Sequence, residues 1–121
     1  MSKIKIPKGS SLVRKNYTVP KPIPKRELKN LFRTALNRGL VSFDSQHLRE
    51  RMFERNVDIL DITHVLKKGR AKIESKWHDD IKKWRYTVTE KDLNNRKLSV
   101  PLEIVFGCSD ELIQIFIITV F

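Results

Sequence analysis

Residues 97–106, KLSVPLEIVF, decide the fold class, because apolar and polar side chains alternate along this stretch with a period of two. The apolar positions are Leu98, Val100, Leu102, Ile104 and Phe106. The pattern predicts a strand with one buried face, and Pro101 predicts that this strand is bulged or lies near a sheet edge. Segments 71–76, 82–90 and 111–120 also predict strands, of which the last, apolar on both faces, is expected to lie centrally. Short turns between these strands predict antiparallel hairpins.

Three helices are expected before the strands. The first should begin just after Pro24, because apolar residues with helical spacing follow it. This apolar stripe consists of Leu28, Leu31, Phe32, Ala35 and Leu36. A second helix should begin after a capping side chain at Asp44 or Ser45 and end near Arg55, and a third should begin after Asp58.

The same spacing predicts which faces of the second and third helices are buried. Leu48 and Met52 should face inward on the second helix. Gly69 should close the third helix, whose inward residues are expected to be Ile59, Ile62, Val65 and Leu66. Residues 40–43, LVSF, fit either a short strand or an extended connector. The order of these patterns predicts an α+β domain in which N-terminal helices pack on one face of a four-stranded antiparallel sheet.

Basic residues are concentrated near the N-terminus of this 121-residue chain, whose net charge is +11. Residues 1–26 contain eight Lys or Arg side chains and no acidic one. Alternating prolines favour an extended chain, so we expect a flexible arm over residues 1–24 and a single domain over residues 25–121. The arm either solubilises the domain or binds a polyanion such as RNA. The residues expected to contact RNA in the second case are Lys21, Lys25 and Arg26.

The composition excludes several classes of protein. The single cysteine, Cys108, excludes a disulfide framework and a multi-cysteine zinc site. The longest apolar run, residues 112–121, has about half the length of a membrane helix, and no N-terminal stretch is apolar enough for a secretory signal. His78, Asp79 and Asp80 are consecutive and cannot converge on one metal without a further ligand. We therefore expect a cytoplasmic protein without a metal site.

The second helix carries the most informative group of polar side chains. His47, Arg51 and Arg55 lie within roughly 80° of one another around the helix axis, beside the predicted buried seam. A histidine titrates near neutral pH and arginines bind phosphate oxygens, so this stripe fits acid–base chemistry on a phosphate ester. Alternatively, the two arginines pair with nearby carboxylates, and His47 only caps or packs. Those carboxylates are Glu54, Asp58 and Asp61.

Residues 84–86, WRY, add a second group on a predicted strand. The period of two places Trp84 and Tyr86 on one face of that strand. Lys83 and Arg85 then lie on the opposite face, where Arg85 would reach an open surface if Trp84 faces the helices. A platform for stacking bases requires an exposed aromatic ring, whereas the alternative is a core tyrosine beside a solvated arginine.

Four short motifs together resemble an uncharacterised family of small bacterial domains. They are FDSQHLRERMFERNV at 43–57, VLKKG at 65–69, WRYTV at 84–88 and ITVF at 118–121. The family pattern reads roughly F-S-x-H-x-x-x-R-M-x-x-R-G-I, V-L-x-x-G, R-Y-x-V and I-T-V-Y, and the resemblance covers about residues 41–121. The sequence departs from it by one extra residue before His47, by Asn56-Val57 in place of Gly-Ile, and by Phe121 where tyrosine is common.

This family is similar to the barnase–EndoU–colicin–RelE group of metal-independent ribonuclease toxins and to MqsR-type mRNA interferases. The resemblance implies a RelE/barnase-like fold, an antitoxin protein as a partner, and catalytic residues at the matching positions. Those catalytic positions are His47, Arg51, Arg55, Arg85 and Tyr86. Two further residues, Lys83 and Thr119, are expected to bind RNA.

We therefore predict a toxin-like endoribonuclease that cleaves RNA by attack of the 2′-hydroxyl, without a metal or a small-molecule cofactor. Such cleavage requires a base for the 2′-hydroxyl proton, an acid for the 5′-oxygen and cations for the charge on the phosphorane. His47 could be the base or the acid, and Tyr86 could donate a proton or stack a base. Two other classes stay open: a non-catalytic RNA- or DNA-binding module, and a protein-interaction domain held by its partner through a sheet edge.

Overall fold

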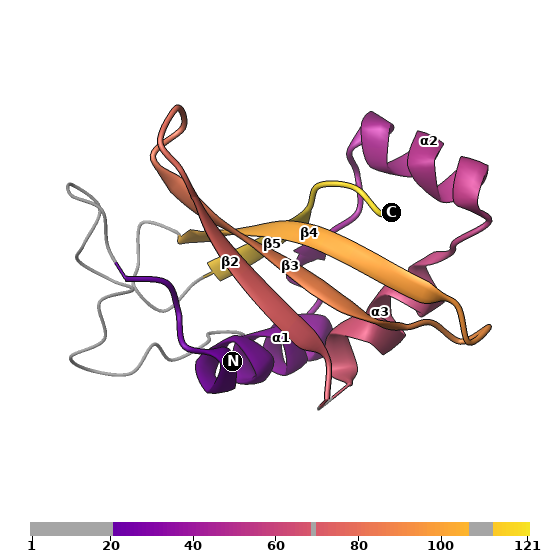
Figure 1. Ribbon diagram of the computed structural model, residues 1–121, viewed down its shortest axis with the longest axis horizontal. Coiled ribbons are helices and arrows are strands. Elements are labelled where there is room, and N and C mark those ends of the chain that lie inside the picture. Colours follow the sequence, from indigo (N-terminus) through magenta and orange to yellow (C-terminus); the bar gives the residue numbers. More distant parts are fainter. Residues whose placement is uncertain (1–20, 69, 107–112) are drawn as a thin grey trace.

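Three helices and a five-stranded mixed sheet make up the part of the chain that the computed structural model describes, which is residues 21–68, 70–106 and 113–121. In chain order the elements are α1 (Lys25–Asn37), β1 (Val41–Ser42), α2 (Gln46–Arg55), α3 (Ile59–Lys67), β2 (Lys72–His78), β3 (Lys83–Lys91), β4 (Lys97–Phe106) and β5 (Ile113–Ile117). Figure 1 shows α1 and α3 on one side of the sheet, whereas α2 stands apart near the C-terminus. The fold is α+β, and none of the described helices is long and apolar enough to cross a bilayer.

The sheet has the strand order β1-β5-β4-β3-β2. The four strands from β2 to β5 form the predicted antiparallel meander, in which each strand pairs with the next along the chain. The prediction of four strands was wrong, because β1 adds a fifth strand that pairs in parallel with β5, with Val41 opposite Ile115. Residues 40–43 thus contain a strand, and a strand of two residues is too short to show a period in the sequence.

Pro101 lies in a central strand, where its missing N–H affects the pairing of β4 with the C-terminal segment. The N–H of Ile118 donates to the Pro101 carbonyl at 2.9 Å, in register with the pairing of β4 and β5. Two residues earlier in β4, the Ser99 backbone exchanges hydrogen bonds of 2.7 and 3.0 Å with that of Phe121, so the facing segment contains one extra residue. Of the two alternatives predicted at Pro101, the edge position was wrong, and the bulge lies on the segment opposite β4. The central position expected for β5 is confirmed.

The hydrophobic core lies between the sheet and the helices α1 and α3. Its fully buried side chains include Leu28, Phe32, Ile62, Val65, Val88, Val100, Leu102, Ile115 and Val120. Leu48 is also fully buried and Met52 is partly buried against the same core, which confirms the predicted inward face of α2. The sheet therefore has one face covered by α1 and α3, and an opposite face that we call the outer face.

Local side-chain signals set the ends of α2 and α3. The Ser45 hydroxyl accepts a hydrogen bond from the Leu48 N–H at 3.3 Å, which begins α2. Asp58 and Asp61 form a reciprocal capping box at the start of α3. Asn56 ends α2 in the left-handed conformation, with φ at 54°. Asparagine tolerates this conformation better than most residues.

The start of α3 and the end of the N-terminal arm differ from the sequence expectations. Ile59 is 48 % exposed, so its predicted inward orientation was wrong: it is the first residue of α3 and lies beyond the packed layer. Gly69 and residues 1–20 lie outside the described residues. Near the end of the predicted arm, Ile23 is buried, and its N–H donates to the Tyr86 hydroxyl at 3.0 Å. Ile23 therefore belongs to the packed body.

Candidate nucleic-acid interface

Helix α2 presents His47, Arg51 and Arg55 at successive turns. His47 and Arg55 are exposed, and Arg51 is partly buried. The Arg51 Nη1 atom lies 3.5 Å from the Glu54 Oε1 atom on the same helix, so one of the predicted ion pairs is formed. The His47 side chain makes no hydrogen bond or ion pair with another residue of the described ranges. The stripe thus offers an open imidazole beside two arginines.

The turn between β3 and β4 holds the C-terminal end of α2. The Arg96 guanidinium donates to the Arg55 carbonyl at 3.1 Å and to the Asn56 carbonyl at 3.0 Å. A cation in this place also opposes the partial negative charge of the last helical carbonyls. Arg96 therefore fixes the end of the helix that carries Arg55.

Asp92 organises this turn from a buried position, with 1 % of its side chain exposed. Its Oδ1 atom accepts hydrogen bonds from the N–H groups of Asn94 and Arg96 at 2.8 and 2.9 Å, and its Oδ2 atom accepts one from Arg96 Nε at 3.1 Å. Burial alone would raise the pKa of Asp92, but these hydrogen bonds and the Arg96 charge hold it below its ordinary value. The turn is also tied to α3, because the Leu93 N–H donates to the Asp61 Oδ1 atom at 3.2 Å.

The outer face of the sheet is rich in basic side chains. The register of β2, β3 and β4 places on it Lys72, Lys76, His78, Lys83, Arg85, Lys91 and Lys97. The acidic residues on the same face of these three strands are Glu74 and Glu103. Hydroxyl side chains lie between them, and two of these, Thr89 and Ser99, are 2.9 Å apart. A positive and polar face of this kind attracts a polyanion.

Arg85 reaches the outer face but is already paired there. Its Nε atom lies 2.7 Å from the Glu103 Oε2 atom on β4, and the Lys83 Nζ atom lies 3.8 Å from the Glu103 Oε1 atom. The Glu103 side chain is only 15 % exposed, so this ion pair is partly desolvated. One carboxylate therefore orients two of the residues that the sequence assigned to the site.

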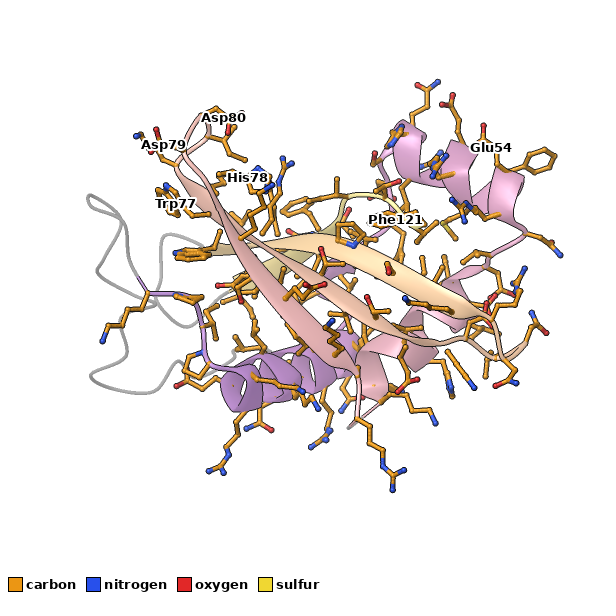
Figure 2. The ribbon with its side chains drawn as sticks, viewed as in Figure 1. Glu54, Trp77, His78, Asp79, Asp80 and Phe121 are labelled. Atoms are coloured by element: carbon orange, nitrogen blue, oxygen red, sulfur yellow. The ribbon has the colours of Figure 1, made fainter. Side chains whose placement is uncertain are left out.

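Tyr86 and Thr119 turn their hydroxyl groups inward. Tyr86 is buried, its hydroxyl accepts the Ile23 N–H, and burial raises its pKa although that hydrogen bond opposes the shift. The Thr119 Oγ1 atom is also buried, without a hydrogen-bond partner in the described residues. Neither hydroxyl is presented to RNA on the outer face. Phe121 differs from both, because 48 % of its surface is exposed (Figure 2).

The turn between β2 and β3 is held together by one carboxylate. The Asp79 Oδ1 atom accepts hydrogen bonds from Lys82 Nζ at 2.8 Å and from Trp77 Nε1 at 3.3 Å. These two contacts, that of Lys82 first, lower the pKa of Asp79. In the described part of the chain, no three His, Cys, Asp or Glu side chains gather as metal ligands would.

The residues assigned to the site from the sequence form two groups at different ends of the molecule. Figure 1 shows α2 beyond one end of the sheet and the β2–β3 turn at the other, and Figure 2 shows His78 well separated from Glu54 of α2. No hydrogen bond or ion pair among the described residues joins Arg85 to the α2 stripe. A third basic set, exposed at or before the start of α1, consists of Lys21, Lys25 and Arg26.

Two features of the structure were not predicted from the sequence. These are the basic residues of β2 and the contacts of Arg96 with the carbonyls at the end of α2. Lys76 and His78 flank Trp77, and this alternation of polar and aromatic residues was a usable signal for an outer-face position. Asp92 and Arg96 are four residues apart in a turn, a spacing that brings an acid and a base together, but the carbonyls that Arg96 binds are distant in the chain.

Comparison with known protein families finds a match, over residues 45–121, to the family described as a domain of unknown function, DUF4258. The chain belongs to the DUF4258 family. No curated protein and no solved structure matches it. The DUF4258 match begins at Ser45, the cap of α2, and includes the α2 stripe, the outer face and the Asp92–Arg96 turn. The helix α1 and the strand β1 lie before it.

Proposed function

We propose that this DUF4258 protein is a cytoplasmic, metal-independent endoribonuclease, similar to RelE and MqsR-type toxins, that binds RNA on its outer face and cleaves it beside α2. The observation that carries the proposal is the exposed His47, which has no partner among the described residues and stands one turn from Arg51. An antitoxin protein would be the partner that controls the activity.

The chemistry assigned to α2 requires one proton-transfer group and two cations. His47 takes the proton from the 2′-hydroxyl or gives one to the departing 5′-oxygen, and the arginines stabilise the phosphorane charge. Arg51 is available for this, because a helix ion pair at 3.5 Å to the exposed Glu54 is weak and a phosphate can replace it. The attacking group belongs to the RNA itself, so the products carry 2′,3′-cyclic phosphate ends.

A second candidate function is a non-catalytic RNA-binding module. The observation that favours it is the burial of the Tyr86 hydroxyl, which leaves His47 as the one proton-transfer side chain exposed in the assigned set. A single imidazole would have to act as base and as acid in turn, or water would have to replace one of them. In the binding module, the same residues only hold phosphates.

The test uses the full chain and end-labelled RNA in excess EDTA. We expect cleavage with cyclic phosphate ends, and His47→Ala should lower the rate by roughly 10²–10⁴ with little change in binding. His64→Ala, which removes a partly buried histidine from α3, is the matched control and should retain the rate. Arg51→Ala should weaken both binding and cleavage, whereas Arg49→Ala, on another side of the same helix, should not.

The outcomes separate the candidate functions. Intact binding without cleavage of any RNA would favour the binding module. Cleavage that is lost in EDTA, or that persists undiminished in His47→Ala, would refute the assignment of His47. If neither Arg51→Ala nor Arg49→Ala weakens RNA binding, the RNA binds away from α2.

A further inference from the structure

We propose that the outer face of the β2–β3 hairpin is a separate anchor for RNA, in which two successive cross-strand pairs of cations each hold one of two neighbouring phosphates. The pairs are Lys76 with Arg85 and His78 with Lys83. This anchor lies at the other end of the sheet from α2 (Figure 1) and needs no proton transfer. It rests on the proposed function only in taking RNA as the ligand.

The strand register brings these four side chains together. Lys76 lies directly opposite Arg85, and His78 directly opposite Lys83, in the antiparallel pairing of β2 with β3. Beyond the pair of Tyr86 with Leu102, β3 has no further partner in β4, so this end of the hairpin is a two-stranded ribbon. Among the described residues, no third strand pairs with this end of the ribbon, and its outer face points away from α1 and α3.

Like charges placed directly opposite each other destabilise a sheet, so the pair of Lys76 with Arg85 is unfavourable for folding alone. Glu103 offsets part of the repulsion through Arg85 and Lys83. The side chains of Lys76 and His78 make no hydrogen bond or ion pair within the described ranges. An anionic ligand would supply the negative group that these two side chains lack as a partner.

The reverse face of the ribbon makes it rigid. Trp77 lies opposite Trp84, and their rings pack edge to face with centroids 5.7 Å apart. The turn beyond them is fixed by Asp79, which binds both Trp77 and Lys82. Figure 2 shows Trp77, His78 and Asp79 grouped at this end of the molecule. The positions of the cations are thus set before a ligand arrives, which reduces the entropy lost on binding.

The spacing of the pairs fits the backbone of a nucleic acid. Residues two apart on a strand are separated by about 6.6 Å, and the two cation pairs are separated by one such step. Successive phosphates of an extended RNA strand have a comparable spacing, and each would meet one pair. Arg85 adds a planar guanidinium that Glu103 holds in place, so a phosphate meets an oriented donor.

The experiment measures binding of a fluorescent single-stranded RNA by the full chain carrying His47→Ala, so that the RNA stays intact. Lys76→Met with Lys83→Met removes one charge from each cation pair but keeps the apolar stems. Each phosphate contact on a single strand contributes about 0.7 to the slope of log Kd against log salt concentration. The loss of two contacts should therefore reduce the magnitude of this slope by about 1.4. Lys91→Met with Lys97→Met is the matched control, because these lysines also lie opposite each other on the outer face, at its other end.

A second measurement guards against misfolding. Lys76→Arg with Lys83→Arg should restore the affinity and the salt slope. The methionine variant should unfold close to the parent temperature, because it relieves the repulsion between Lys76 and Arg85 while Glu103 loses Lys83 but keeps Arg85. A slope that falls equally in the Lys91 and Lys97 control would show diffuse binding over the face and overturn the anchor. An unchanged slope would overturn it as well.

A competitor distinguishes the class of ligand. Polyglutamate of equal charge should not displace the RNA at comparable concentration, and displacement by it would favour an acidic protein and overturn the RNA assignment. These results are independent of cleavage. A protein that never cuts RNA but needs both cation pairs to bind it would refute the ribonuclease and retain the anchor.

Discussion

Replacing Asp92 by asparagine should destabilise the domain, although the two side chains have nearly the same shape. The carboxylate is 1 % exposed and accepts hydrogen bonds from two backbone N–H groups and from the Arg96 guanidinium. In Asp92→Asn, an amide N–H₂ group would replace one oxygen, and the charge that attracts Arg96 would be lost. Arg96 would then hold the carbonyls at the end of α2 less firmly.

The magnitude follows from the contacts that change. A hydrogen bond to a charged group contributes about 1.5–3 kcal/mol, and Asp92→Asn loses the one from Arg96 while it weakens the others. We expect a loss of about 2 kcal/mol in the free energy of unfolding at neutral pH. For a domain of this size, such a loss lowers the Tm by roughly 8–16 °C.

Thermal unfolding followed by circular dichroism between pH 7 and pH 2 provides the test. The folded-state pKa of Asp92 is lowered, so its contribution to stability is fully present above the unfolded pKa of about 3.9. That contribution is lost as the pH falls through the folded pKa, where the wild-type carboxylate takes up a proton. The Tm difference between wild type and Asp92→Asn should therefore shrink in this acidic range and be constant from pH 5 to 7.

Asp80→Asn is the matched control for this experiment. Asp80 is an exposed acid in the other hairpin turn, so its replacement should change the Tm by no more than about 2 °C, within the usual range of surface substitutions. A Tm of Asp92→Asn as close to wild type as that of Asp80→Asn would refute the reasoning. A large difference that persists unchanged to pH 2 would show that the charge of Asp92 is not its cause.

Three further substitutions test the placement of residues on α2 and β3. Tyr86→Phe removes the acceptor of the buried Ile23 N–H and should cost about 1–2 kcal/mol of stability, measured by urea unfolding. RNA cleavage should not change. A large loss of cleavage at unchanged stability would instead make the Tyr86 hydroxyl catalytic. Leu48→Ala should lower the free energy of unfolding by about 2–5 kcal/mol, because Leu48 is fully buried. Arg51→Ala should lower it by less than about 1 kcal/mol. Equal losses would mean that the orientation of α2 is wrong.

The sequence was sufficient for the helices and for which strand residues share a face, because both depend on short-range periodicity. Ser45 and Asp58 cap the helices as expected, and the alternation around Tyr86 correctly separated it from Arg85. Ile59 was assigned wrongly because a helical period continues past the residues that the core can cover. A period shows which residues share a face, but not where the packed layer ends.

The pairing of distant segments could not be predicted from the sequence. The ion pair of Arg85 with Glu103 spans 18 residues and depends on the register of β3 with β4. The binding of Arg96 to the Arg55 carbonyl spans 41 residues, and nothing local to either residue indicates it. The candidate site was therefore predicted as a list of residue types on correct faces, whereas its division between two ends of the molecule required the tertiary structure.

The parallel pairing of β1 with β5 delays the completion of this domain while the chain is being made. Ile115 is synthesised roughly 70 residues after its partner Val41, which at about 5–20 residues per second takes roughly 4–15 s. During that time α1 can pack on α3, but the strand β5 that it also contacts does not yet exist. The apolar side of α1 consequently stays open to other proteins for seconds in every round of translation, and a chaperone that binds nascent apolar segments has that long to engage it.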